Sequence, residues 1–301
     1  MKLALALTLT TVLSAQTVQV LLKDGKRVEG TAKSINIQAG GRNIPLRSLL
    51  SLHNGAAAEG EEARRIDSLL AQLNTAAVDE LTAIGIPVVS PLLALYKDTD
   101  QHEPRPLYRL FARIMPDGLD QLERTDSLLR LANGEAFRSK VSDFTINVAG
   151  QAIPWSNIRR LAVRQARVEK NADLQALQHC TQIEYLDTAI EVGTDSTLTV
   201  TAQGLIRNAF NQDGWASDAD GLKVPGPNYK TNLVDGHPFG AVVARTGNGD
   251  VQRIGKNFSG KANDTGRFRL AVNDNRHWQN NIGAFKVKVT ATNAYDLGDP
   301  R

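Results

Sequence analysis

Residues 272–289 read Val-Asn-Asp-Asn-Arg-His-Trp-Gln-Asn-Asn-Ile-Gly-Ala-Phe-Lys-Val-Lys-Val and place a polar loop between two runs of alternating sequence. Apolar residues occupy every second position on both sides of the loop: Phe268, Leu270 and Val272 before it, and Phe285, Val287 and Val289 after it. This period of two is typical of strands that bury one face. The stretch therefore predicts two half-buried strands joined by a polar loop.

The loop itself carries candidate metal ligands. Asp274, Asn280 and Asn281 offer hard oxygen donors, the ligand type that calcium selects. The alternative is a turn network, since Asp and Asn side chains also cap turns without metal. Trp278 is a candidate ligand contact or else a core residue, and His277 is a candidate ligand contact or a solvent-facing loop residue.

Composition limits the class of protein. The chain has 301 residues, 42% of them apolar and 22% charged, which favours a globular protein of two or more domains. The formal net charge of +3 is small, and no arginine-rich run or aromatic-interleaved basic patch occurs. Nucleic acid is therefore not expected as a partner.

No catalytic signature occurs in the sequence. Gly-x-Ser-x-Gly, the phosphate-binding Walker loop, His-Glu-x-x-His and Cys-x-x-Cys are all absent. His179 and Cys180 are neighbours, but side chains at adjacent positions usually diverge. We expect no enzyme.

The first fifteen residues have the layout of a secretory signal peptide. Lys2 precedes a short apolar run over 3–13, and Ser14-Ala15-Gln16 supplies a small residue at the cut, which we place after Ala15. The run is too short for a membrane anchor. We therefore expect an exported protein, periplasmic, extracellular or at the cell surface, without a membrane span. Cys180 is the single cysteine, so no internal disulfide is expected.

The chain repeats itself at a shift of 109 residues. Leu22-Lys-Asp-Gly25 matches Leu131-Ala-Asn-Gly134, and Ile44-Pro45 matches Ile153-Pro154. Asp-Gly and Asn-Gly are hairpin signals between alternating runs. We expect two small β units, at 16–55 and 126–168, that pair with each other because neither buries much surface alone. The pattern is loosely similar to small SH3-like or Sm-like barrels.

The residues between and after the copies divide further. Helical spacing at Ile66, Leu69 and Leu70 and the Pro-rich run over 83–95, which resembles a HEAT-type repeat, predict a helical insert at 56–122. The full division is given by these ranges: signal peptide 1–15, β unit 16–55, helical insert 56–122, β unit 126–168, connector 169–182, β-sandwich 183–293 and tail 294–301. Within the sandwich, strands are expected at 239–246, 251–258, 265–273 and 283–292. The predicted fold class is multidomain and mostly β.

The C-terminal part, about 183–292, resembles the calcium-dependent galactophilic lectins of bacteria. The similar pieces occur in order: Asp187-Thr-Ala-Ile190, Leu198 to Gly204, Phe239 to Gly247, Asn273-Asp274, and Asn280-Asn281-x-Gly283-x-Phe285. The resemblance implies a β-sandwich and covers just over a third of the chain. It says nothing about residues 16–180.

The resemblance also implies ligands. Asp274, Asn280 and Asn281 match the family's side-chain ligands to calcium, and galactose would bind the ion through two hydroxyls. One carbonyl ligand would come from His277 or Trp278, in a loop one residue shorter than the family's. A second would come either from near Asn208 or from after 214–217. The family's histidine-proline sugar contact has no assigned counterpart, because His237-Pro238 lies too close to the next strand.

Two functions follow as expectations. The first is an exported carbohydrate-binding protein, in which calcium bridges the sandwich to sugar hydroxyls, galactose-type by the family's default. Contacts through one ion are weak, so avidity would require either a homo-oligomer or clustered display. The alternative is a structural or adaptor protein of the cell envelope, whose sandwich binds calcium or nothing and no sugar.

Overall fold

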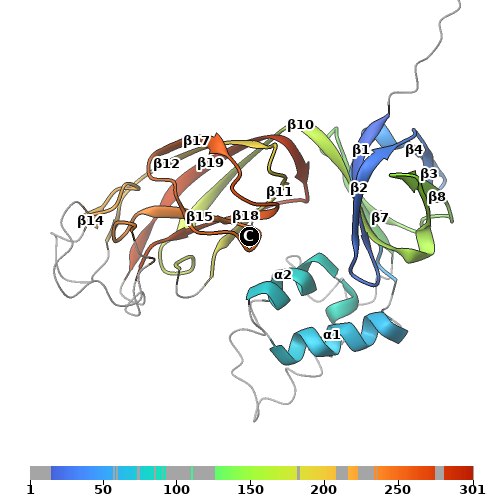
Figure 1. Ribbon diagram of the computed structural model, residues 1–301, viewed down its shortest axis with the longest axis horizontal. Coiled ribbons are helices and arrows are strands. Elements are labelled where there is room, and N and C mark those ends of the chain that lie inside the picture. Colours follow the sequence, from blue (N-terminus) through green and yellow to red (C-terminus); the bar gives the residue numbers. More distant parts are fainter. Residues whose placement is uncertain are drawn as a thin grey trace, which may run out of the picture.

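The chain folds mostly into antiparallel strands, and the expected mostly β, multidomain class is confirmed (Figure 1). A barrel and a sandwich lie side by side, with a pair of helices below their junction in the view of Figure 1. The computed structural model describes residues 15–56, 58, 60–72, 75–84, 86–89, 91–92, 110, 126–181, 184–207, 216–222, 234, 236–274 and 281–300.

The barrel contains the two repeated sequences. The first copy forms β1 (Gln16–Leu22), β2 (Arg27–Ala32), β3 (Asn36–Ala39), β4 (Arg42–Pro45), a 3-10 turn (Leu46–Ser48) and β5 (Leu49–His53). The second forms β6 (Ser127–Leu131), β7 (Ala136–Ser139), β8 (Thr145–Val148), β9 (Gln151–Pro154), a 3-10 turn (Trp155–Asn157) and β10 (Ile158–Gln175). β3, β4 and the turn recur 109 residues later as β8, β9 and the second turn, so the sequence repeat is a repeat of structure.

The copies exchange partners with each other. β1 pairs with the start of β10, and β5 pairs with β6, so the first strand of each copy joins the last strand of the other. The bridges Ala32 to Val148 and Ala39 to Val141 are related by the same shift of 109. One apolar cluster contains buried residues of both copies. The two copies therefore share strand pairings and one core.

Two helices follow the first copy. They are α1 (Gly60–Gln72) and α2 (Thr75–Ile84), with a 3-10 turn at Ile86–Val88. Ile66, Leu69 and Leu70 face a small apolar cluster of their own, at the helical spacing expected for the insert. The sequence also predicts a helix containing Leu107, Leu110, Phe111 and Ile114. Leu110 is helical and buried in the same cluster, and the other three lie outside the described residues. Among the described helices, none has the length and apolar character needed to cross a bilayer.

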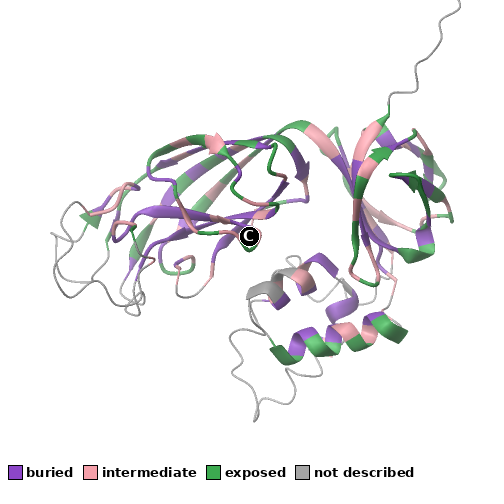
Figure 2. Ribbon diagram, in the orientation of Figure 1, coloured by how far each residue is buried: buried purple, intermediate pink, exposed green. Residues whose placement is uncertain are grey.

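The sandwich has two antiparallel layers over one core. One layer runs β10–β19–β12–β17 and the other β11–β18–β15–β16. Its strands are β11 (Leu186–Val192), β12 (Thr197–Gln203), β13 (Ile206–Arg207), β14 (Ala216–Ser217), β15 (Val242–Thr246), β16 (Gln252–Arg253), β17 (Asn257–Lys261), β18 (Gly266–Val272) and β19 (Ile282–Asp296). Figure 2 shows buried residues along the strands of both layers.

β19 shows the predicted alternation of buried and exposed residues. Phe285, Val287 and Val289 are buried, whereas Lys286 and Lys288 are exposed. The prediction of a single strand at 251–258 is wrong, because this stretch contains β16 and the start of β17 as separate strands. Gly255 separates them with a φ of +64°, a left-handed conformation that interrupts a strand and that glycine adopts without strain.

The expected connector at 169–182 is also wrong in its first half. Residues 164–175 continue β10 and pair with β19 along its length, from Arg164 opposite Tyr295 to Gln175 opposite Ala284. The segment reads as polar because its outward positions face water, while Val168 and Leu174 enter the core. β10 thus belongs to both barrel and sandwich, and no boundary falls at residue 168.

The expected tail at 294–301 belongs in part to the fold. β19 continues to Asp296, and Ala294, Tyr295 and Leu297 are buried. The amide of Leu297 donates to the carbonyl of Ala189, 2.9 Å away. The sandwich therefore includes residues that the alternating pattern alone did not reveal.

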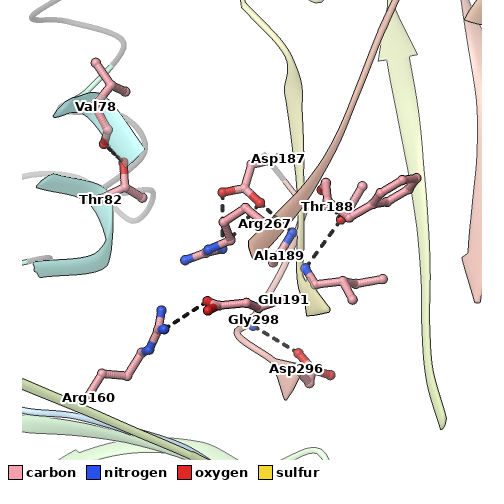
Figure 3. Close-up of polar contacts among 12 residues, drawn as sticks. Val78, Thr82, Arg160, Asp187, Thr188, Ala189, Glu191, Arg267, Asp296 and Gly298 are labelled. Carbon is pink, nitrogen blue, oxygen red and sulfur yellow. Dashed lines mark hydrogen bonds and ion pairs between the residues drawn. The ribbon is translucent and has the colours of Figure 1, made fainter. Parts of the chain in front are cut away.

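Two adjacent arginines of β10 join the three units. Arg159 pairs with Glu62 of α1. Arg160 pairs with Glu191 of β11 at 2.9 Å, as Figure 3 shows. All four side chains are buried. Adjacent residues of a strand point to opposite faces, so one strand reaches the helices and the sandwich at once.

The Arg160–Glu191 pair is fully ionised at neutral pH. Burial by itself raises the pKa of Glu191, but the guanidinium groups of Arg160, Arg27 and Arg267 outweigh it and lower the pKa to about 2. Burial lowers the pKa of Arg160 to about 10 against the opposing effect of Glu191. Breaking such a pair is costly, because it leaves one charge buried alone.

Candidate cation site at the end of the sandwich

Asp274 and Asn281 lie together at the end of the sandwich that is distant from the barrel. β18 ends at Val272, two residues before Asp274, and β19 begins at Ile282, directly after Asn281. β10 starts in the barrel and ends beside them, since the amide of Ala176 donates to the carbonyl of Gly283, 3.1 Å away (Figure 1). Two strand ends therefore bring these side chains to one place.

The two side chains are in direct contact and buried. Asp274 is 1% exposed and Asn281 2% exposed. The Asn281 Nδ2 donates to Asp274 Oδ2 and also to the carbonyl of Ala176, at 3.3 Å. Among the residues that the structure describes, none donates to the Asn281 Oδ1, which is buried. A buried oxygen without a donor costs free energy, so this atom requires an explanation.

A divalent cation is one partner that would suit this atom. A carboxylate and an amide oxygen side by side are ligands that calcium accepts. Rotating the Asn281 amide by half a turn would place its Oδ1 beside the Asp274 carboxylate. Two oxygens at such a short distance repel each other unless a cation lies between them. The residues present therefore fit a calcium ion, with Asp274 and Asn281 as two of its side-chain ligands.

Neighbouring segments hold Asp274 in place. The Thr181 hydroxyl donates to the backbone carbonyl of Asp274 at 3.1 Å. Asn273, which is fully buried, donates through Nδ2 to the carbonyls of His237 and Pro238, at 3.0 and 3.3 Å. Its Oδ1 accepts from the amide of Val234 at 3.1 Å. The sequence did not point to these positioning roles, although an Asn directly after a strand is a signal for them.

The structure places some of the other predicted residues and not the rest. Asn280, His277 and Trp278 lie outside the described residues, as does Asn208. The competing segment for a carbonyl ligand includes β14, which pairs with β13, and β13 pairs with the start of β19.

The His237-Pro238 segment, set aside from the sequence, lies beside the site. Its two carbonyls accept from Asn273, the residue before Asp274. The His237 imidazole Nε2 is 3.3 Å from the carbonyl of Val251, in the turn before β16. The segment therefore supports the end of β18 through its backbone.

The same end of the sandwich exposes apolar side chains. Of the large apolar residues in the described ranges, three are strongly exposed: Leu177, Leu205 and Ile282, at 47%, 67% and 47%. Leu177 follows Ala176, Leu205 precedes β13, and Ile282 follows Asn281. Grouped exposed apolar residues often mark a binding surface. The sequence did not identify this group.

Within the described part of the chain, no cluster of three His, Cys, Asp or Glu side chains is arranged to hold a metal. The site at Asp274 differs from such clusters because its described members are one carboxylate and one amide. Oxygen donors of this kind suit calcium better than zinc, which prefers nitrogen and sulfur ligands.

The chain has weak similarity to solved structures. No protein-family model matches the chain, and no curated protein matches it. A solved structure described as "EclA N-terminal domain; PllA-like lectin" is similar at 18% identity, over 41% of this chain and 96% of that one, with a TM-score of 0.31. A TM-score of 0.31 is too low to assign a function to this chain. The proposed function therefore rests on the chain's own residues.

Proposed function

We propose that the chain is a carbohydrate-binding protein, in which calcium at the end of the sandwich bridges Asp274, Asn280 and Asn281 to sugar hydroxyls. The observation that carries the proposal is the buried contact of Asp274 with Asn281, whose Oδ1 has no donor among the described residues. A cation would supply the partner of that oxygen. Sugar hydroxyls would then replace water on the ion.

The surroundings of the pair also support binding at this end. Leu177, Leu205 and Ile282 expose apolar surface next to it, and sugars bind by combining hydroxyl contacts with apolar ring faces. In this proposal His277 and Trp278 belong to the sugar-contacting loop. Galactose is the first sugar to test, and export through the segment 1–15 would bring the protein to its ligand.

Glycan retention with and without a chelator tests the proposal. The full chain is applied to a glycan array in calcium, and then in excess EDTA. We expect retention that calcium supports and EDTA abolishes. Asp274→Ala and Asn281→Ala should lose it, whereas Asp250→Ala, an exposed carboxylate in the turn between β15 and β16, should keep it. Retention that survives Asp274→Ala would exclude the proposed site.

A second function is favoured by a different observation. The barrel and helices make up much of the chain. One buried ion pair joins the barrel to the helices and another joins it to the sandwich, as in a structural or adaptor protein of the cell envelope. The same array separates the two functions. A melting temperature that calcium raises, in a protein that retains no glycan, would favour the structural function.

A further inference from the structure

A cavity of about 400 Å³ lies where the barrel, the helices and the sandwich meet. The β1–β2 hairpin contributes Arg27, α1 contributes Arg65 and the start of β18 contributes Arg267 and Arg269. Pockets of this volume at the junction of domains commonly hold small molecules. The cavity is distant from Asp274, which lies at the other end of β18.

The lining carries more positive than negative charge. Four arginines line it, against two carboxylates, Glu80 and Asp264. Arg65 pairs with Glu80. Two of the arginines are oriented by carboxylates that do not line the cavity. Arg27 Nη1 lies 3.2 Å from Glu191 Oε1, and Arg267 Nη1 lies 3.2 Å from Asp187 Oδ2. Each of these two contacts engages Nη1 alone, of a group that carries five N–H donors.

The sandwich side of the cavity is a fixed wall. Gly247, in the turn after β15, is in direct contact with the start of β18. A Cβ on Gly247 would lie 2.2 Å from the Thr265 carbonyl oxygen, and one on Gly266 would lie 2.8 Å from the Gly247 Cα. Arg269 is 2% exposed and donates through Nη2 to the Gly247 carbonyl at 2.6 Å. Because backbone and guanidinium are held together, this wall is formed before any ligand arrives.

We propose that this cavity is a second binding site, for a small molecule that carries a phosphate or sulfate ester. Guanidinium groups are suited to tetrahedral oxyanions because their forked donors bind two oxygens at once. The cavity volume exceeds what a free inorganic anion requires and suits a group of monosaccharide size. Since the arginines come from all three units, a bound ester would fix the units relative to one another.

Isothermal titration calorimetry of the full chain tests this proposal. The probes are glucose 6-phosphate, glucose 6-sulfate, inorganic phosphate and glucose, at one ionic strength. We expect heat of binding with at least one of the two esters and none with glucose. Arg27→Gln and Arg65→Gln should each weaken binding about tenfold or more, since each removes charge-assisted hydrogen bonds. Arg42→Gln is the matched control, because Arg42 pairs with Glu135 on the surface of the same barrel.

The outcomes separate this site from the proposed calcium site. Asp274→Ala should bind the ester as the parent chain does, even if it loses glycan retention. Circular dichroism melting of each variant shows that it is folded, and Arg65→Gln keeps the test valid if Arg27→Gln is destabilised. Absence of ester binding by the parent chain, or an affinity in both arginine variants equal to that of the parent chain, would overturn the proposal.

Discussion

The two ends of the sandwich bury carboxylates in different ways. At the end joined to the barrel, Glu191 meets two guanidinium groups, those of Arg160 and Arg27, at 2.9 and 3.2 Å. At the distant end, Asp274 meets the amide of Asn281. Both acids are almost inaccessible to water. The charge at the first end is matched by the chain's own arginines, whereas a polar oxygen at the second, Asn281 Oδ1, has no donor among the described residues.

This difference separates structure from binding. A buried ion pair that is complete within one chain holds two units in a fixed relation and needs no added cation. A buried carboxylate beside an amide would instead be completed by an added cation. The two ends of the sandwich should therefore respond to different perturbations.

The largest expected effect comes from breaking the anchored end. Glu191→Gln leaves Arg160 buried without its carboxylate, so we expect the free energy of unfolding to fall by about 3–5 kcal/mol. Urea denaturation followed by circular dichroism measures it. Glu135→Gln removes the exposed partner of Arg42 and should change stability little. A neutral result for Glu191→Gln would show that the pair does not hold the units together.

Acid should weaken the same end. The pKa of Glu191 is lowered in the folded chain to about 2, from an ordinary value of 4.5. Its stabilising contribution is therefore complete above about pH 4.5 and is lost as the pH falls from there through about 2. The total is on the order of 3 kcal/mol. Stability measured between pH 6 and 3 should decline less steeply in Glu191→Gln, and parallel curves for the two proteins would contradict this account.

Calcium should act on the distant end. At about a hundred times its dissociation constant, a ligand that binds only the folded state stabilises it by about 2.7 kcal/mol. We expect calcium to raise the melting temperature and EDTA to reverse the rise, with no effect in Asp274→Ala. Hydrogen exchange should slow near residues 273–274 and 281–283, and not at residues 159–160. Equal protection at both ends would remove the distinction between them.

The smallest expected effect concerns the support of Asp274. Thr181→Val removes the hydroxyl that donates to the Asp274 carbonyl while keeping the shape of the side chain. We expect a loss of about 1 kcal/mol in stability and weaker calcium affinity. Calcium titration by calorimetry measures the second effect, with Thr199→Val on the exposed face of β12 as the control. Unchanged affinity would show that Thr181 does not position the site.

Sequence alone predicted the parts of the fold that local pattern determines. Alternation at Phe285, Val287 and Val289 predicted a strand buried on one face, and the matched turn signals at Gly25 and Gly134 predicted two similar units. The second half of β10 was not predicted as a strand because its outward residues are polar or charged and only Val168 and Leu174 mark its buried face. A strand with one solvent-exposed face has few apolar residues by which to recognise it.

The site was predicted in part for the same reason. Asp274 and Asn281 were recognisable as oxygen donors flanking a loop, and the structure brings them into contact. The anchoring pairs were not predictable, because Arg159 and Arg160 lie 97 and 31 residues from their carboxylates. Nothing local shows that adjacent arginines will be buried, since each partner is supplied by tertiary structure.

β10 has a mechanical consequence. Its 18 residues run without interruption from the barrel to the end of the sandwich that holds Asp274, a span of roughly 60 Å. A force applied to a ligand at that end would be transmitted along β10. The hydrogen bonds between β10 and β19 would then be loaded in shear, all at once rather than one after another. β10 thus transmits tension from the end of the sandwich near Asp274 directly to the barrel.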